Sequence, residues 1–152
     1  MLATDTVVRP SCVAEMRDAC GPLFAAHHAE LRSVRPDGLG LDLNVEAFAA
    51  AEQRRDLVCR VAWAADQPVG YAVAAFYDNP MCRGDLVLLA SAVFVAPAAR
   101  STDAWPQLAD ALRDAADAAN ARLVWSVYAG TAAAVVLERR CGPPRELTFY
   151  ER

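Results

Sequence analysis

The chain has 152 residues, of which 55% are apolar and 22% are charged, and its formal net charge is −4. This composition predicts one globular domain over residues 1–152 and argues against a disordered chain. The negative charge argues against nucleic-acid binding, and no apolar run reaches the roughly 18 residues that a membrane span needs. Because the N-terminal segment lacks a basic region followed by an apolar core, we expect a cytoplasmic protein without a secretory signal.

Scarce residue types exclude several kinds of chemistry. All 15 lysine or arginine positions are arginine, which excludes lysine Schiff bases and lysine-containing phosphate loops. The cysteines are scattered and the two histidines are adjacent, so the sequence has no spacing typical of a zinc site. We therefore expect no metal, and we expect reduced, mostly buried thiols.

Apolar periodicity and turn residues predict elements in the order β-α-α-β-β-β-α-β-α-β. In chain order they are a strand over 6–9, a helix from Ser11 to about Arg32, a helix over 44–55, strands over 57–64, 69–77 and 86–95, a helix from the 98–105 loop to about Ala121, a strand over 123–128, a helix over 131–140 and a strand over 145–150. The early strands suit antiparallel pairing, whereas residues 86–128 suit a right-handed parallel crossover. We therefore expect an α/β (α+β) domain with a mixed sheet flanked by helices.

Local signals mark several of these boundaries. Ser11 and Asn44 are expected to cap the first two helices, and Gly142 followed by Pro143 should end the last one. A turn is expected at 66–68. The strand over 86–95 is almost wholly apolar, as expected of a central strand that is buried on both faces.

Three segments resemble the Gcn5-related N-acetyltransferase family. Ala65–Tyr71 (ADQPVGY) is similar to the hairpin between that family's second and third strands. Val93–Arg100 (VFVAPAAR) is similar to its fourth strand and the start of its coenzyme motif, and Leu137–Gly142 (LERRCG) to the end of its last helix. The stretch Tyr71–Arg100 is also similar to phage-encoded members. The resemblance covers nearly the whole chain, and it implies that family's fold, with the fourth and fifth strands splayed apart.

The resemblance also implies acetyl-CoA as co-substrate, held between the splayed strands. The backbone of Phe94, Val95 and Ala96 would pair with the pantetheine amides as if the coenzyme were another strand. The N-terminus of the following helix would hold the pyrophosphate. The residues expected around the pyrophosphate are Arg100, Ser101, Thr102, Asp103, Ala104 and Trp105.

This pyrophosphate segment departs from the family's pattern at two positions. The family has glycine at the position of Asp103 and glycine or alanine at the position of Trp105. A backbone without large side chains can wrap phosphates closely. A carboxylate about 4 Å from a pyrophosphate would cost on the order of a few kcal/mol at an effective dielectric constant near 20. Either Asp103 turns away and caps the helix while Ser101 and Thr102 bind phosphate, or the segment no longer binds the coenzyme well.

Two residues are candidates for catalysis, which requires an acid for the leaving thiolate. Counting back from Gly142, the position of the family's tyrosine acid is Glu138; the alternative is a solvated residue at a helix end. Tyr128, at the end of the strand over 123–128, could reach the thioester or simply anchor the rim of the sheet.

The acceptor side has candidates from two elements. His27 and His28 lie in the first helix, which in the resembled family often shapes the acceptor site; a structural histidine is the alternative. Tyr77 and Asp78 end the third strand, where they could face an amine or form an ordinary strand end.

Together these features predict transfer of an acetyl group from acetyl-CoA to a primary amine of a small molecule or protein by direct attack. One alternative is a non-catalytic interaction module with the same fold, whose cleft would be closed by Trp105 or by another chain. A weaker alternative is a phage-type modification of an amine on a nucleic-acid base or host protein. We expect a monomer or a homodimer.

Overall fold

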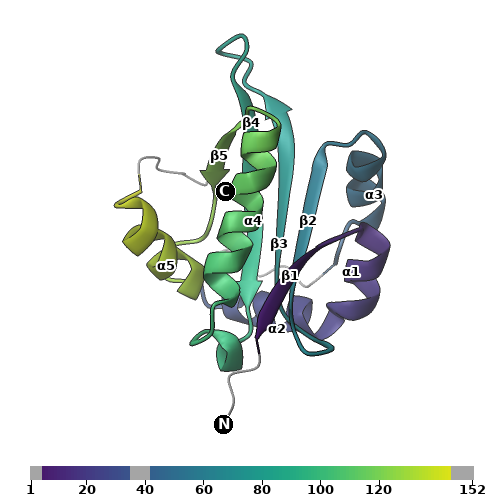
Figure 1. Ribbon diagram of the computed structural model, residues 1–152, viewed down its shortest axis with the longest axis vertical. Helices are drawn as coiled ribbons and strands as arrows, with labels where there is room; N and C mark the ends of the chain where they lie inside the picture. Colours follow the sequence, from purple (N-terminus) through teal and green to yellow (C-terminus); the bar gives the residue numbers. More distant parts are fainter. Residues whose placement is uncertain (1–4, 35–41, 145–152) are drawn as a thin grey trace.

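A five-stranded sheet with helices on both faces makes up the molecule, of which the computed structural model describes residues 5–34 and 42–144 (Figure 1). The strands, which are adjacent in chain order, are β1 (Thr6–Ser11), β2 (Leu57–Ala64), β3 (Gln67–Asp78), β4 (Leu86–Val95) and β5 (Arg122–Trp125). The helices are α1 (Val13–Ala19), α2 (Gly21–Arg32), α3 (Val45–Gln53), the short 3-10 helix η1 (Pro97–Ala99), α4 (Ala104–Ala118) and α5 (Ala132–Cys141).

The pairing of the strands confirms the mixed sheet. β1 to β4 pair antiparallel in sequence order, and β5 pairs parallel to β4 after the crossover through α4. β2 and β4 have the predicted bounds. β3 is longer than predicted because the turn consists of Ala65 and Asp66, with Ala65 at a φ of 52°. Gln67 and Pro68, expected in the turn, therefore belong to β3.

The helix expected from Ser11 to Arg32 is in fact two helices. β1 continues through Ser11, and Cys12 caps α1, with its Sγ accepting a hydrogen bond from the Glu15 amide at 3.5 Å. The break at Cys20 has a simple cause, since Pro22 has no amide hydrogen and restricts the residue before it. Pro22 fits the first turn of α2, where that missing hydrogen leaves no helical bond unmade.

The last part of the chain follows the predicted order with shorter elements. β5 ends at Trp125, so Tyr128 lies in the loop before α5 rather than in a strand. Thr131 caps α5, with its Oγ1 accepting from the Ala134 amide at 3.2 Å. The strand predicted over 145–150 lies outside the described residues.

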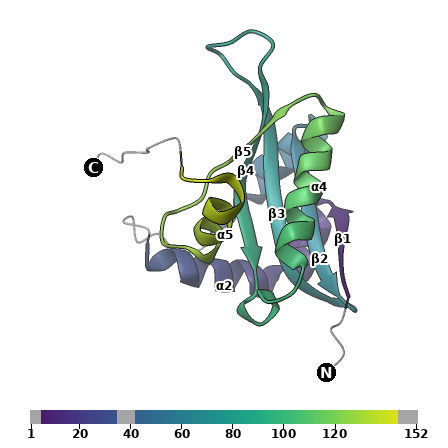
Figure 2. The same cartoon turned by 60° about the vertical axis from the view of Figure 1, so that its left-hand side comes forward.

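Both faces of the sheet are buried. α4 and α5 cover one face, and α1 and α2 pack on the other (Figures 1 and 2). Along β3, Ala72 and Ala74 contribute to the core under α4, which includes Leu108. Tyr71 and Val73 contribute to the core under α1 and α2. Because successive side chains of a strand point to opposite faces, β3 contributes to two separate apolar cores.

A β-bulge in the middle of β4 lies where β4 and β5 stop pairing. Ser91 is an extra residue, because its neighbours Ala90 and Ala92 pair with consecutive residues of β3. The extra residue reverses the alternation, so that Ala90 and Val93 both face the core under α4. β5 pairs with β4 only as far as Ala90, and beyond the bulge the two strands separate. The predicted splay of the fourth and fifth strands is thus confirmed.

Gly70→Ala is expected to destabilise the sheet. A Cβ at this position would lie 2.9 Å from the Phe94 carbonyl oxygen, 3.1 Å from Val95 Cγ2 and 3.3 Å from Leu108 Cδ1. Since a backbone carbonyl in a paired strand cannot move cheaply, we expect the free energy of unfolding in urea to fall by about 1–3 kcal/mol. Gly21→Ala is the control, because no described atom lies within 4 Å of its added methyl group. Equal unfolding midpoints for the two variants would contradict this account.

Candidate active site

The second half of β4 faces the first turn of α5 across a narrow space that we call the strand gap, bounded by residues 91–95 and 131–134. Figure 2 shows α5 beside this half of β4 and above α2. Groups from α2, β4, the segment after β4, α4 and α5 line a cavity there of about 10 Å³. That volume is the room of a single water molecule. The strands have separated, but side chains nearly fill the space between them.

β4 directs backbone groups into the strand gap. The Ala96 amide donates to the Val69 carbonyl at 2.8 Å, so Ala96 points towards β3. Because successive residues of a strand point their N–H and C=O groups to opposite edges, Val93 and Val95 point into the gap. Of the three residues expected to offer backbone groups to a ligand, Val95 therefore directs its N–H and C=O groups into the gap, whereas Phe94 and Ala96 direct theirs towards β3.

A carboxylate and a guanidinium join three elements around the gap. Glu30 of α2 forms an ion pair with Arg100, and its Oε1 accepts from the Ala132 amide at the start of α5 at 3.1 Å. Arg100 Nε donates to the Val95 carbonyl at 3.0 Å, and the guanidinium lies 5.6 Å from the centre of the Phe94 ring. We call this set of contacts the Glu30 bridge. It ties α2 and α5 to the end of β4.

His27 lies one turn before Glu30 on α2 and borders the same cavity. Its ring stacks on Phe94, with centroids 5.0 Å apart and an interplanar angle of 19°, and its Nδ1 lies 2.6 Å from the Tyr71 hydroxyl. Burial lowers the pKa of His27 from its ordinary 6.5, and burial raises the pKa of Tyr71. Both groups are therefore neutral near pH 7. The pair is satisfied when Tyr71 donates to Nδ1, which leaves the imidazole hydrogen on Nε2.

Acid is expected to weaken the fold through His27. Because its pKa is lowered in the folded state, the unfolded chain binds this proton first as the pH falls below about 6.5. The free energy of unfolding should then decrease from about pH 6.5 down to the lower pKa of the folded protein. Thermal midpoints across this range should fall less steeply in His27→Asn than in the wild type. His28→Asn is the control, since the contacts with Tyr71 and Phe94 belong to His27, and an unchanged slope in His27→Asn would refute the assignment.

Asp103 turns away from the segment expected to bind pyrophosphate. Its exposed carboxylate accepts from Gln107 Nε2, one turn further along α4. It makes no capping hydrogen bond, contrary to one of our expectations. The Thr102 hydroxyl does this instead, accepting from the Ala104 amide at 3.2 Å while donating to the Ala99 carbonyl at 2.7 Å. The Asp103 carboxylate does not need the amides at the helix end as partners, because the side-chain amide of Gln107 donates a hydrogen bond to it.

Trp105 points into the core. It is 4% exposed, and its ring centroid lies 6.2 Å from that of Trp125. Its side chain also borders the strand gap from the side of α4. Trp105 therefore contributes to the floor of the gap, whereas the contacts that span the gap are those of Glu30 with Arg100 and Ala132.

Two backbone amides before α4 are available to an anion. Within the described residues, the amides of Ser101 and Asp103 donate to no other group. Both residues are exposed, and both precede a helix of 15 residues. Unpaired amides before a helix are the usual partners of phosphate groups.

Four predicted residues do not border the cavity in the strand gap. Glu138 is exposed on the last turns of α5, whose first turn borders the gap. Tyr128 is half-buried in the loop before α5, where its carbonyl accepts from Thr131 Oγ1 at 2.7 Å. Tyr77 and Asp78 are exposed at the end of β3, which lies beside the start of β4 because the two strands are antiparallel. The gap is at the other end of β4, so these two residues are separated from it.

The structure thus brings together only part of the predicted set. The predicted residues that border the gap are His27, Phe94, Val95, Arg100 and Trp105. His28 is half-buried beside His27 and does not border the cavity. Glu30 and Tyr71 also belong to this region, although they were not among the predicted residues. The one local signal for Glu30 was its position three residues after His27, which places both on one side of a helix.

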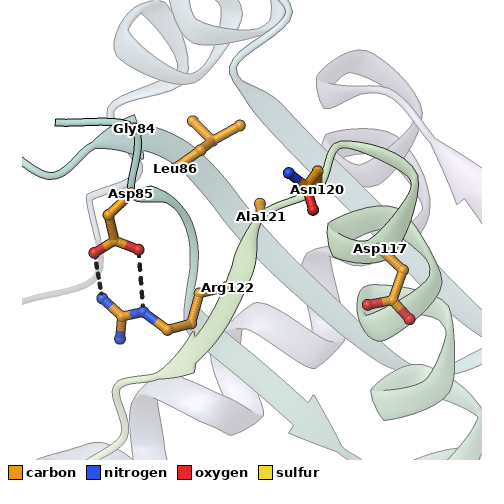
Figure 3. Close-up of a pocket in the computed structure, with 7 residues that line it drawn as sticks. All are labelled: Gly84, Asp85, Leu86, Asp117, Asn120, Ala121 and Arg122. Carbon is orange, nitrogen blue, oxygen red and sulfur yellow. Dashed lines mark hydrogen bonds and ion pairs between the residues drawn. The ribbon is translucent and has the colours of Figure 1, made fainter.

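A second, more open hollow of about 340 Å³ lies at the other end of the sheet (Figure 3). Asp85 and Arg122 form an ion pair at its edge, at 2.8 Å, and Asn79 Nδ2 donates to the same carboxylate at 2.7 Å. The hydrogen bond from Arg122 and, to a lesser extent, that from Asn79 lower the pKa of Asp85. They fasten the β3–β4 connection to β5. In the described part of the chain, no three His, Cys, Asp or Glu side chains are placed to hold a metal, and no helix there could span a membrane.

Comparison with known proteins identifies the fold. No family model and no curated protein matches the sequence. A tetramutant of the BH1408 protein from Bacillus halodurans matches with a TM-score of 0.75 and 17% identity over 96% of this chain and 98% of that one. The ribosomal-protein-alanine N-acetyltransferase from Brucella melitensis biovar Abortus 2308 has a TM-score of 0.73 and 16% identity over 97% of both chains.

A third structure, described as a predicted acetyltransferase from Clostridium acetobutylicum, was solved with acetyl-CoA. It has a TM-score of 0.72 and 13% identity over 97% of this chain and 96% of that one. The chain therefore has the fold of the Gcn5-related N-acetyltransferases, as the resemblance in its sequence implied.

Proposed function

We propose that this protein transfers an acetyl group from acetyl-CoA to a primary amine of a small molecule or a protein. The observation that carries the proposal is the separation of β4 from β5 beyond the Ser91 bulge. It leaves backbone groups of Val93 and Val95 facing the gap, and the chain then leads through Arg100 to the amides before α4. Fold neighbours described as acetyltransferases support the reaction class, and one of them was solved with acetyl-CoA.

The residues present fit the coenzyme. The amides of Ser101 and Asp103 and the guanidinium of Arg100 would hold its phosphates. The backbone of Val93 and the amide of Val95 would pair with its pantetheine amides in the manner of an added strand. The carboxylate of Asp103, bonded to the side chain of Gln107, need not face the phosphates.

The chemistry asks little of the protein. The uncharged amine forms a C–N bond to the acetyl carbon, the nitrogen loses a proton, the C–S bond breaks, and the leaving thiolate takes up a proton. With Tyr71 donating to its Nδ1, His27 would carry its hydrogen on Nε2, and since it borders the gap it would act as a hydrogen-bond donor there. Tyr128 and Glu138 are the candidates for the acid that protonates the thiolate.

Release of free CoA thiol tests this proposal. The protein is mixed with acetyl-CoA and a panel of primary amines, including a polyamine, an aminoglycoside and peptides with a free N-terminus. We expect thiol release that depends on one class of amine and saturates with acetyl-CoA. No release above hydrolysis with any amine, together with no acetyl-CoA binding at millimolar concentration, would contradict it.

A non-catalytic interaction module is the second candidate, and one observation favours it. The cavity in the strand gap is about 10 Å³. Ligand sites have roughly 300–1,000 Å³, so the gap must open before any coenzyme can enter. If the protein were such a module, the gap would stay closed in the presence of acetyl-CoA.

A further inference from the structure

One carboxylate contacts both sides of the strand gap. Glu30 Oε2 pairs with Arg100 on the β4 side, and Glu30 Oε1 accepts from the Ala132 amide on the α5 side. The two oxygens of a single side chain therefore engage opposite walls of the gap. The side chain is 25% exposed, so solvent reaches it without unfolding of the domain.

We propose that Glu30 is an autoinhibitory side chain that occupies the coenzyme's place in the free protein and is displaced when acetyl-CoA binds. This inference rests on the proposed function. The carboxylate lies against the Arg100 guanidinium and the N-terminal end of α5. The positive charge there, and the Ala132 amide, which has no partner within its own helix, favour any anion. A coenzyme whose phosphates recruit Arg100 competes for the same guanidinium.

Such competition lowers the apparent affinity for the coenzyme. When only a fraction of the molecules has an open gap, the apparent dissociation constant is the intrinsic one divided by that fraction. The arrangement also links two events, because Arg100 can turn to a phosphate only after it has left Glu30. Release of Ala132 by the same carboxylate would free α5 to move away from β4.

Glu30→Gln separates this role from a purely structural one. Glutamine has the same size, and its carbonyl can still accept from the Ala132 amide, but the charge that holds Arg100 is lost. We expect calorimetry to show acetyl-CoA binding about tenfold more tightly to E30Q than to the wild type. Asp110→Asn is the matched control, since it removes a carboxylate that pairs with Arg140 of α5 at 2.6 Å, far along the helix from the gap. Its affinity should equal that of the wild type.

The outcomes distinguish the two proposals. Wild-type binding with equal or weaker binding by E30Q overturns the autoinhibitory role and leaves the proposed function standing. No binding by either protein overturns both. A second measurement needs no substitution: the Ala132 amide resonance of the wild type should shift when acetyl-CoA is added, because its hydrogen bond to Glu30 is lost. A resonance that stays in place at saturating acetyl-CoA would also overturn the role of Glu30.

Discussion

Replacing Trp105 by alanine is expected to lower the free energy of unfolding by about 3–5 kcal/mol, the usual cost of removing a buried aromatic side chain. Trp105 is 4% exposed and packs against Trp125 in the core under α4. In the family that the sequence resembles, this position holds glycine or alanine. The size of the loss therefore tests whether the tryptophan is needed for the core. A large loss would show that the tryptophan serves packing in this core.

Urea denaturation with circular dichroism measures this effect. Trp105→Phe is the control, because it retains an aromatic ring and should lose less stability than the alanine variant. A loss below about 1 kcal/mol for Trp105→Ala would mean that the ring is not part of the core, and the site would then have to be re-examined around it.

Arg100→Gln is expected to weaken acetyl-CoA binding by about ten- to a hundredfold, the range that loss of charge-assisted hydrogen bonds typically gives. Arg100 precedes Ser101 and Asp103, whose amides donate to no other group within the described residues, and it borders the strand gap. Calorimetry gives the dissociation constants. Unchanged affinity would place the phosphates elsewhere.

A double variant makes this prediction sharper. Arg100→Gln also removes the ion pair with Glu30, so Glu30→Gln has nothing left to release in that background. E30Q should tighten binding in the wild type and leave it unchanged in R100Q. This non-additivity is expected of two side chains in direct contact, and additive effects would argue that they act separately.

The sequence predicted the elements best where apolar runs end at clear turns. β2 and β4 have such ends, and their bounds agree with the structure. The break between α1 and α2 was missed because Met16, Cys20 and Leu23 keep helical spacing across it and join one apolar core. The bulge at Ser91 could not be read either, since an almost wholly apolar strand has no alternation from which a change of register would show.

The site was predictable only where its residues are close in sequence. Arg100 was found from a local motif at the end of a strand. Glu30, its partner, lies 70 positions away on α2, and no local pattern connects the two. The direction of Asp103 was left open because it depends on a competition between the helix end and the side chain of Gln107, which the structure resolves in favour of the glutamine.

Coenzyme binding in the strand gap is tested by titrating the isotope-labelled protein with acetyl-CoA and following its backbone amide resonances. We expect saturable shifts at Val93 and Val95 on β4 and at Ser101 and Asp103 before α4. Val93 and Val95 face the strand gap, and Ser101 and Asp103 lie in the segment that joins β4 to α4. Absence of shifts at millimolar acetyl-CoA, or shifts confined to the hollow around Asp85 at the other end of the sheet, would contradict this prediction.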